Sequence, residues 1–101
     1  MHMWWTIDIK DGKVTYDNIS WMGDHFKINA ASVFSLTQDL LQIKFQKEWI
    51  LDVGWYPDLD VKGSFKLILI KNQQWENPSF TFECKDIKSL KQAISKVIQT
   101  L

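Results

Sequence analysis

Residues 48–83 read EWILDVGWYPDLDVKGSFKLILIKNQQWENPSFTFE, and this stretch decides the fold. It contains three apolar runs, which are separated by two segments rich in Gly, Pro, Asp and Asn. Short apolar runs bounded by such turn-forming residues are typical of strands joined by loops. The stretch therefore predicts a three-stranded antiparallel meander, with strands at residues 49–55, 65–70 and 80–84.

The side-chain pattern within these runs indicates how each strand is buried. In the first run, large apolar side chains occupy every second position: Trp49, Leu51, Val53 and Trp55. Such alternation is typical of a strand with one face against the core. The second run is apolar at almost every position, which is typical of a central strand covered on both faces.

The C-terminal residues have a helical period. Apolar side chains recur at steps of three and four residues, at Ile87, Leu90, Ile94, Val97, Ile98 and Leu101. Lysines and glutamines lie between them, and Asp86 or Ser89 is a suitable N-cap. This pattern predicts an amphipathic helix whose apolar face covers the sheet.

Two further strand signals precede the meander. Residues 5–9 alternate apolar and polar side chains, Asp11-Gly12 is a favourable turn dipeptide, and residues 14–16 are again extended in character. These features predict an N-terminal hairpin that extends the sheet. Residues 19–21 and 26–28 are further candidates for short strands.

Residues 32–46 carry two competing patterns. Val33, Leu36 and Leu40 have helical spacing, with Ser32 or Ser35 as a possible N-cap. Leu41, Ile43 and Phe45 instead alternate with polar residues, as a strand does. We predict a helix of two to three turns from Ser35, and its end between residues 35 and 46 stays open.

Together these elements predict an α+β fold in one domain, residues 1–101. Its single antiparallel sheet has about five strands, formed by the N-terminal hairpin and the three-stranded meander. The C-terminal amphipathic helix and a shorter middle helix pack against it. A chain of 101 residues buries roughly two-thirds of its unfolded surface, which is enough for a core without a metal or a disulfide.

Charge is balanced overall but unevenly distributed. Residues 1–60 carry five lysines against nine acids, a net charge of −4, and residues 61–101 carry seven lysines against three acids, a net charge of +4. An acidic face attracts a basic partner and repels nucleic acid. All twelve cationic side chains are lysines, and Arg is the side chain that grips phosphate and guanine bidentately. We therefore expect no nucleic-acid partner.

Cysteine usage and hydropathy indicate a compartment. Cys84 is the single cysteine, so no intrachain disulfide forms, as is usual in a reducing environment. Residues 1–6 lack the basic region and the cleavage site of a signal peptide. The longest apolar run is far shorter than the roughly 20 residues of a membrane span. We expect a cytoplasmic protein without membrane association.

The candidates for catalysis are few. Asp52, Asp58 and Asp60 flank residues 54–57, and paired carboxylates can act as acid and base or bind a divalent ion. His25 follows Asp24, which leaves open a small hydrolase that uses His25 and a nearby carboxylate. Nucleophile-elbow, glycine-rich phosphate-loop and calcium-loop motifs are absent from the sequence. We expect no enzymatic activity, no metal and no cofactor.

The aromatic residues suggest recognition instead. Six Trp, six Phe and two Tyr exceed what one small core readily holds, so some are expected at a binding surface. Trp55 and Tyr56 stand at a predicted strand end beside Asp52, Asp58 and Asp60. Aromatic rings supply packing and cation–π contacts, and carboxylates steer a Lys- or Arg-rich partner. The alternative is that Trp55 is a core residue and the acids solubilise a turn.

Three segments carry a family resemblance: W-x-L-D-V-G-W-Y-P at residues 49–57, D-x-x-G-x-F at residues 60–65 and I-K-N-x-x-W-E-N-P at residues 70–78. They resemble small bacterial immunity proteins of polymorphic-toxin and contact-dependent growth-inhibition systems. The resemblance implies a cytoplasmic antitoxin that binds the toxin domain of its own system, often a nuclease with a basic cleft.

Under this resemblance, the expected partner-binding residues are Asp52, Trp55, Tyr56, Asp58 and Asp60, with Trp75 and Glu76 as secondary contacts. Asp11, Asp17 and Asp24 are alternative acidic contacts. A third interpretation is an oligomeric adaptor that self-associates through exposed tryptophans.

Overall fold

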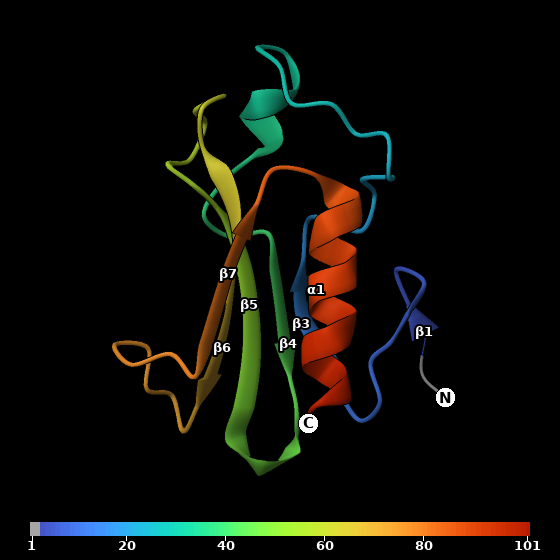
Figure 1. Cartoon of the computed structure of the whole chain (residues 1–101), viewed down its shortest axis with the longest axis vertical. Coiled ribbons are helices and arrows are strands. Elements are labelled where there is room, and N and C mark those ends of the chain that lie inside the picture. Colours follow the sequence, from blue (N-terminus) through green and yellow to red (C-terminus); the bar gives the residue numbers. More distant parts are fainter. Residues whose placement is uncertain (1–2) are drawn as a thin grey trace.

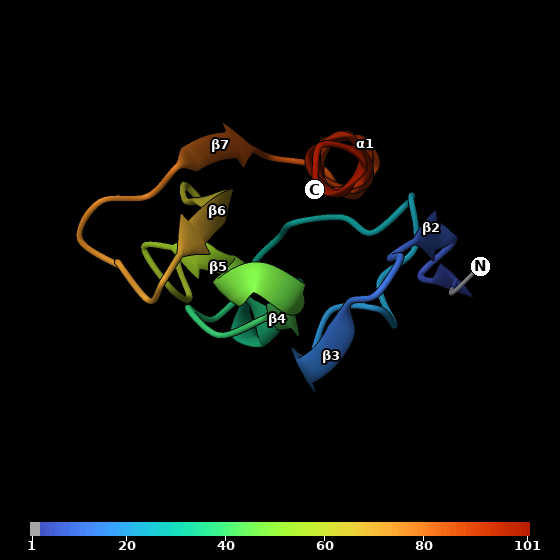
Figure 2. The same cartoon turned by 90° about the horizontal axis from the view of Figure 1, so that it is seen from below.

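The computed structural model describes residues 3–101, and its main feature is a five-stranded antiparallel sheet with one helix against its concave face (Figures 1 and 2). The strands lie in the order β3-β4-β5-β6-β7. Their bounds are β3 Lys13–Asp17, β4 Leu41–Lys44, β5 Trp49–Tyr56, β6 Ser64–Lys71 and β7 Phe80–Cys84, and the helix α1 spans Ile87–Gln99. The predicted α+β class, with about five strands and a C-terminal helix, is confirmed.

The meander forms where the sequence predicts it. β5 pairs with β6 along its full length, from Trp49 opposite Lys71 to Tyr56 opposite Ser64. β6 then pairs with β7 from Phe65 opposite Cys84. β6 is therefore an inner strand of the sheet, but the prediction that both its faces are covered is wrong, because α1 covers one face and Ile68 on the other face stays partly exposed beside Asp52.

The core lies between the sheet and α1. Leu51, Val53 and Trp55 of β5 are fully buried, and the Trp55 ring meets Phe65 edge-to-face at 4.8 Å between ring centroids. The helix contributes its own buried face, and it begins at Asp86, whose side chain accepts a hydrogen bond from the Ser89 backbone N–H at 2.7 Å. That bond satisfies one of the free N–H groups of the first turn.

The predicted N-terminal hairpin is wrong. β2 (Ile7–Asp8) pairs with β1 (Met3–Trp4) in a separate two-stranded ladder, and β3 joins the main sheet through β4. Trp5 and Thr6 adopt positive φ, which divides the predicted strand by a tight turn. The apolar alternation nevertheless has a structural basis, because Ile7 and Ile9 are buried in the core.

The candidate strands at residues 19–21 and 26–28 do not form either. The Asp17 carboxylate accepts hydrogen bonds from the backbone N–H groups of Ile19 and Ser20, at 3.0 and 2.9 Å. Such local bonds turn the chain and compete with strand pairing. Ile19 is fully buried from this turn.

The predicted middle helix is wrong as well. Residues 35–46 hold only the end of a short 3-10 turn (η1, Ser32–Ser35), the whole of β4, and the start of a second such turn (η2, Gln46–Glu48). The alternation of Leu41 and Ile43 with polar neighbours prevails over the helical spacing, because β5 offers β4 a ladder from Ile50 to Val53. No helix within residues 3–101 has the length and apolarity that a bilayer crossing requires.

Candidate functional site

The loop between β5 and β6 is fixed to the body of the protein by two hydrogen bonds, and a third bond lies within the loop. The Trp55 ring donates from Nε1 to the Asp60 carbonyl at 2.8 Å. The Asp60 carboxylate accepts from the Lys62 backbone N–H at 2.9 Å, and the Leu59 N–H donates to the Leu36 carbonyl at 2.8 Å. Gly63 closes the loop, since a Cβ there would lie 2.5 Å from Trp55 Nε1. These contacts fix the conformation of the loop, so its exposed side chains form a defined surface.

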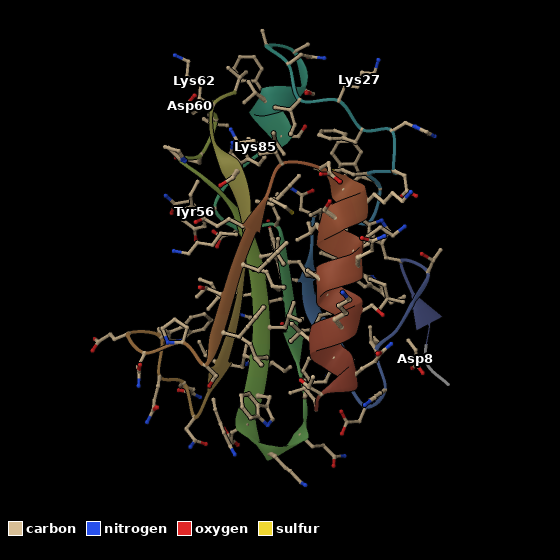
Figure 3. The ribbon with its side chains drawn as sticks, viewed as in Figure 1. Asp8, Lys27, Tyr56, Asp60, Lys62 and Lys85 are labelled. Atoms are coloured by element: carbon tan, nitrogen blue, oxygen red, sulfur yellow. The ribbon has the colours of Figure 1, made fainter. Side chains whose placement is uncertain are left out.

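This surface exposes apolar side chains beside acids. Leu59 and Val61 are 49% and 47% exposed, Asp58 is exposed and Asp60 is partly exposed. Phe34 in η1 is 75% exposed, and the bond from Leu59 to Leu36 holds this segment at the same end of the molecule. Figure 3 shows Asp60 and Lys62 at this end. We call these residues, Phe34, Asp58, Leu59, Asp60 and Val61, the acidic tip.

Trp55 does not belong to the acidic tip at the surface. Its side chain has no exposed area and packs on Phe65, so the prediction that Trp55 is presented to a partner is wrong. The alternation that places Leu51 and Val53 in the core places Trp55 there too. Its contribution to the site is indirect, because its Nε1 holds the Asp60 carbonyl.

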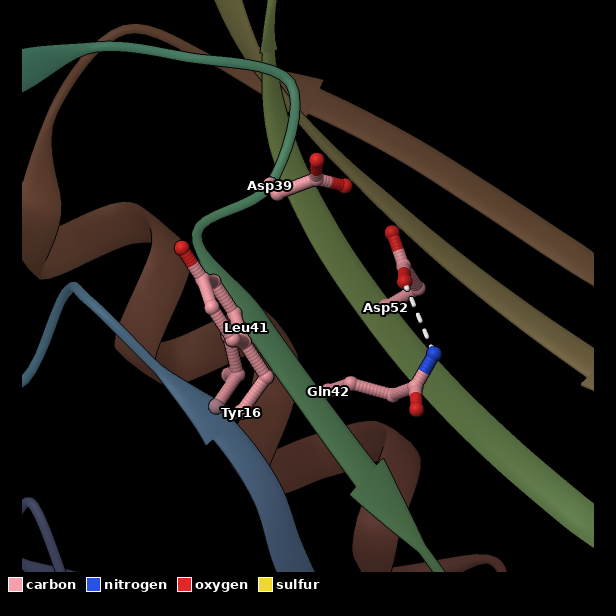
Figure 4. Close-up of a pocket in the computed structure, with 5 residues that line it drawn as sticks. All are labelled: Tyr16, Asp39, Leu41, Gln42 and Asp52. Atoms are coloured by element: carbon pink, nitrogen blue, oxygen red, sulfur yellow. Dashed lines mark hydrogen bonds between the residues drawn. The ribbon is translucent and has the colours of Figure 1, made fainter.

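Asp52 and Tyr56 alternate with the core residues of β5 and face away from α1. Tyr56 is partly exposed on that outer face, with Lys66 Nζ 5.8 Å from its ring centroid (Figure 3). Gln42 Nε2 donates to Asp52 Oδ2 at 3.5 Å. A pocket of about 230 Å³ lies here, and Figure 4 shows the residues that line it: Tyr16, Asp39, Leu41, Gln42 and Asp52.

Two carboxylates, those of Asp39 and Asp52, line this pocket. Burial raises the pKa of Asp52 to about 6, against the hydrogen bond from Gln42, and the charge of Asp39 raises it further. Burial also raises the pKa of Tyr56, and the charges of Asp52 and Asp39 add to that rise. The outer face thus carries both signs of charge, since the register places Lys44 and Lys66 on the face of Asp52, and the charge of Asp52 is sensitive to pH near 6.

Trp75 and Glu76 lie at the other end of the sheet, in the loop between β6 and β7. Both are exposed and line a pocket of about 490 Å³. The register places this loop next to Trp49 and the acidic tip next to Tyr56. Seven strand steps separate these positions, roughly 23 Å. The structure therefore places Asp52 and Tyr56 on the outer face of β5 and Asp58 and Asp60 in the loop that follows, and it leaves Trp75 and Glu76 as a separate cluster.

The residues of the hydrolase alternative do not meet at this site. His25 is exposed in a loop, and the neighbouring Asp24 contacts Lys91 Nζ of α1 at 3.4 Å. Neither residue lines the pocket of Asp39 and Asp52. Across residues 3–101, no group of three or more His, Cys, Asp or Glu side chains is arranged to hold a metal ion.

The sequence interpretation omitted four residues that the structure brings into the site: Phe34, Asp39, Leu59 and Val61. Leu59 and Val61 carried a usable signal, because apolar residues between acids in a turn have no core to enter. Asp39 carried none, because it lies in the segment that was predicted as a helix from Ser35, and Phe34 directly precedes that segment. Comparisons with protein-family models, with curated proteins and with solved structures find no match for this chain.

Proposed function

We propose that this chain is an immunity protein, which binds one cognate toxin domain and blocks it in a tight, charge-complementary complex. The observation that carries the proposal is the acidic tip, where Leu59 and Val61 are exposed next to two carboxylates in one loop and Phe34 is exposed at the same end of the molecule. Apolar side chains of this size form the centre of protein interfaces, and acids at the rim steer a basic partner. The partner would be a basic nuclease domain in the cytoplasm, and the chain itself performs no chemistry.

The outer face supplies a path for a larger contact. From the tip, Tyr56 and Asp52 follow along the outward face of β5, with Lys66 beside Tyr56 and Asp39 beside Asp52. A standard interface buries about 800 Å² on each partner, so its width is comparable with the length of β5. One partner lying along this face would also reach Trp75 and Glu76, which keeps them as secondary contacts.

The test pairs this chain with the C-terminal domain of a large secreted protein encoded in the adjacent gene, the usual arrangement in such systems. The toxin domain alone should stop growth, and co-expression of this chain should restore it. Purified, the two should form a one-to-one complex with a nanomolar dissociation constant that weakens with salt. Absence of both protection and binding would overturn the proposal.

Variants locate the contact. Asp58→Lys reverses an exposed charge, and Asp60→Asn removes a charge while an amide oxygen can still accept from the Lys62 N–H. We expect affinity to fall by about tenfold or more for each. Asp11→Lys is the matched control, because Asp11 is exposed and lies outside the tip and the outer face. Loss of affinity in the control alone would place the interface elsewhere.

A further inference from the structure

A second surface of the molecule has the features of a strand-binding site. β7 pairs with β6 on one side, and no strand within residues 3–101 pairs with its other side. An open edge presents backbone N–H and C=O groups that can accept a further strand. Because β7 carries Phe80 and Phe82 at alternate positions, the edge combines unpaired backbone groups with large apolar side chains.

A groove runs beside this edge, between β7 and α1. Two pockets of about 290 and 460 Å³ share Phe80, Lys96 and Val97, and so they are neighbours along one groove. Its walls are mainly apolar, formed by Trp49, Leu69, Phe80, Phe82, Ala93 and Val97. Phe80 is 41% exposed, although its neighbours in the fold offer an apolar surface to pack on. This is the β7–α1 groove.

The charge of the residues that line the β7–α1 groove distinguishes between two possible occupants, a second copy of this chain and a segment of another protein. Lys96 is the only charged residue among those that line the two pockets, and α1 carries three lysines and no acid. A second copy pairing β7 with β7 would set two α1 helices on one face of the joined sheet, with like charges between them. A segment with a carboxylate beside Lys96 meets the opposite charge instead.

We propose that the β7–α1 groove binds an extended segment of a partner protein. The segment adds along β7 as a sixth strand, directs alternate apolar side chains into the groove and places one Asp or Glu beside Lys96. Main-chain hydrogen bonds to β7 hold it, and the groove selects its side chains. This goes beyond the proposed toxin inhibition, because the groove shares no residue with the acidic tip.

The probe is a synthetic peptide, acetyl-Glu-Thr-Val-Thr-Val-Thr-Glu-amide. Its Glu and Val side chains share one face of an extended strand, and either strand direction brings one Glu to Lys96. Titrated into the full ¹⁵N-labelled chain, it should shift the amide resonances of β7 and α1 with a dissociation constant below about 1 mM. The same peptide with Lys in place of Glu, and an N-methylated version that lacks the edge N–H groups, should each bind about fivefold more weakly or worse.

Two variants of the protein complete the test. Lys96→Glu should weaken the Glu peptide by about fivefold or more and strengthen the Lys peptide. Lys88→Glu is the matched control, because Lys88 is exposed on the same helix and lines neither pocket, and it should change binding less than about twofold. Equal binding of the Glu, Lys and N-methylated peptides, no saturable shift in β7, or concentration-dependent self-pairing of β7 would each overturn the proposal.

Discussion

Along β5, the side chains that point toward α1 and those that point away from it differ in chemistry and in burial. Leu51, Val53 and Trp55 face inward and are fully buried. Asp52 and Tyr56 face outward, where they are partly exposed and border other polar groups. The inward side chains hold the sheet against the helix, whereas the outward ones are free to serve recognition. Over residues 51–56, one strand therefore separates fully buried core side chains from partly exposed polar ones with a period of two residues.

The largest effect on stability is expected for a substitution on the inward face, at Trp55. Trp55→Ala removes a buried ring and the Nε1 bond that holds the Asp60 carbonyl, and we expect a loss of about 4 kcal/mol in the free energy of unfolding. Trp75→Ala is the matched control, because Trp75 is 46% exposed, and it should cost less than about 1 kcal/mol. Chemical denaturation measures both. Should Trp55→Ala prevent folding, the milder variant Trp55→Phe can be compared with Trp75→Ala instead. Equal losses of unfolding free energy at the two tryptophans would contradict the comparison.

A substitution at Gly54 tests a place on β5 where the backbone of another segment covers the outward face. A Cβ at this position would collide with the Gln38 carbonyl, and the bonds Trp55 N–H to Thr37 carbonyl and Leu40 N–H to Val53 carbonyl, at 2.8 and 3.0 Å, hold that segment in place. Gly54→Ala should therefore cost about 2 to 3 kcal/mol.

Gly23→Ala provides the control for Gly54→Ala, since a Cβ at Gly23 meets no atom within 4 Å and its φ is not positive. It should leave stability unchanged or raise it by about 0.5 kcal/mol, because the unfolded chain loses freedom. Thermal unfolding of the two variants side by side checks the pair. A Gly54→Ala variant as stable as the wild type would show that residues 37–40 can move away from β5.

These contrasts also explain how much of the fold the sequence could predict. The meander and α1 depend on neighbouring residues, since β5, β6 and β7 pair in chain order and Asp86 caps the helix beside it. Local patterns are therefore sufficient for them. The pairing of β3 with β4 joins segments more than twenty residues apart, and no pattern within either segment identifies its partner.

The same limit applies to the site. The acids of residues 52–60 were recognisable in the sequence, but the alternation that identifies β5 also assigns Trp55 to its buried face. Asp39 lies near Asp52 only because residues 37–40 pack beside β5. This is a tertiary contact that no local sequence pattern predicts. Sequence reasoning thus found the charges of residues 52–60 and missed Asp39 and the exposed apolar side chains.

Asp52 allows a smaller and pH-dependent test of the outward face. Its pKa is raised to about 6 in the folded protein, against an ordinary value of 3.8, so the folded state holds a proton more tightly than the unfolded chain. The contribution of Asp52 to stability is then most favourable below about pH 4, falls as pH rises toward 6 and stays lower above that value.

Asp52→Asn should remove this cost while its amide oxygen can still accept from Gln42. We expect the variant to match the wild type near pH 4 and to exceed it by about 1 kcal/mol at pH 7, after allowance for solvent screening. Denaturant titrations at several pH values measure the difference. A difference that is the same at pH 4 and pH 7 would mean that ionisation of Asp52 is not its cause.

The smallest expected change in stability is at Tyr56. Its hydroxyl makes no hydrogen bond to the described residues, and its ring already has Lys66 beside it, so Tyr56→Phe should shift the free energy of unfolding by less than about 0.5 kcal/mol. If the outward face is the toxin contact, the same variant should weaken the complex by about fivefold, since interfaces commonly use a Tyr hydroxyl as a polar anchor. Calorimetric titration and denaturation of one preparation give both numbers. A loss of stability without a loss of affinity would reverse the assignment, because Tyr56 would then belong with Trp55 among the residues that hold the fold.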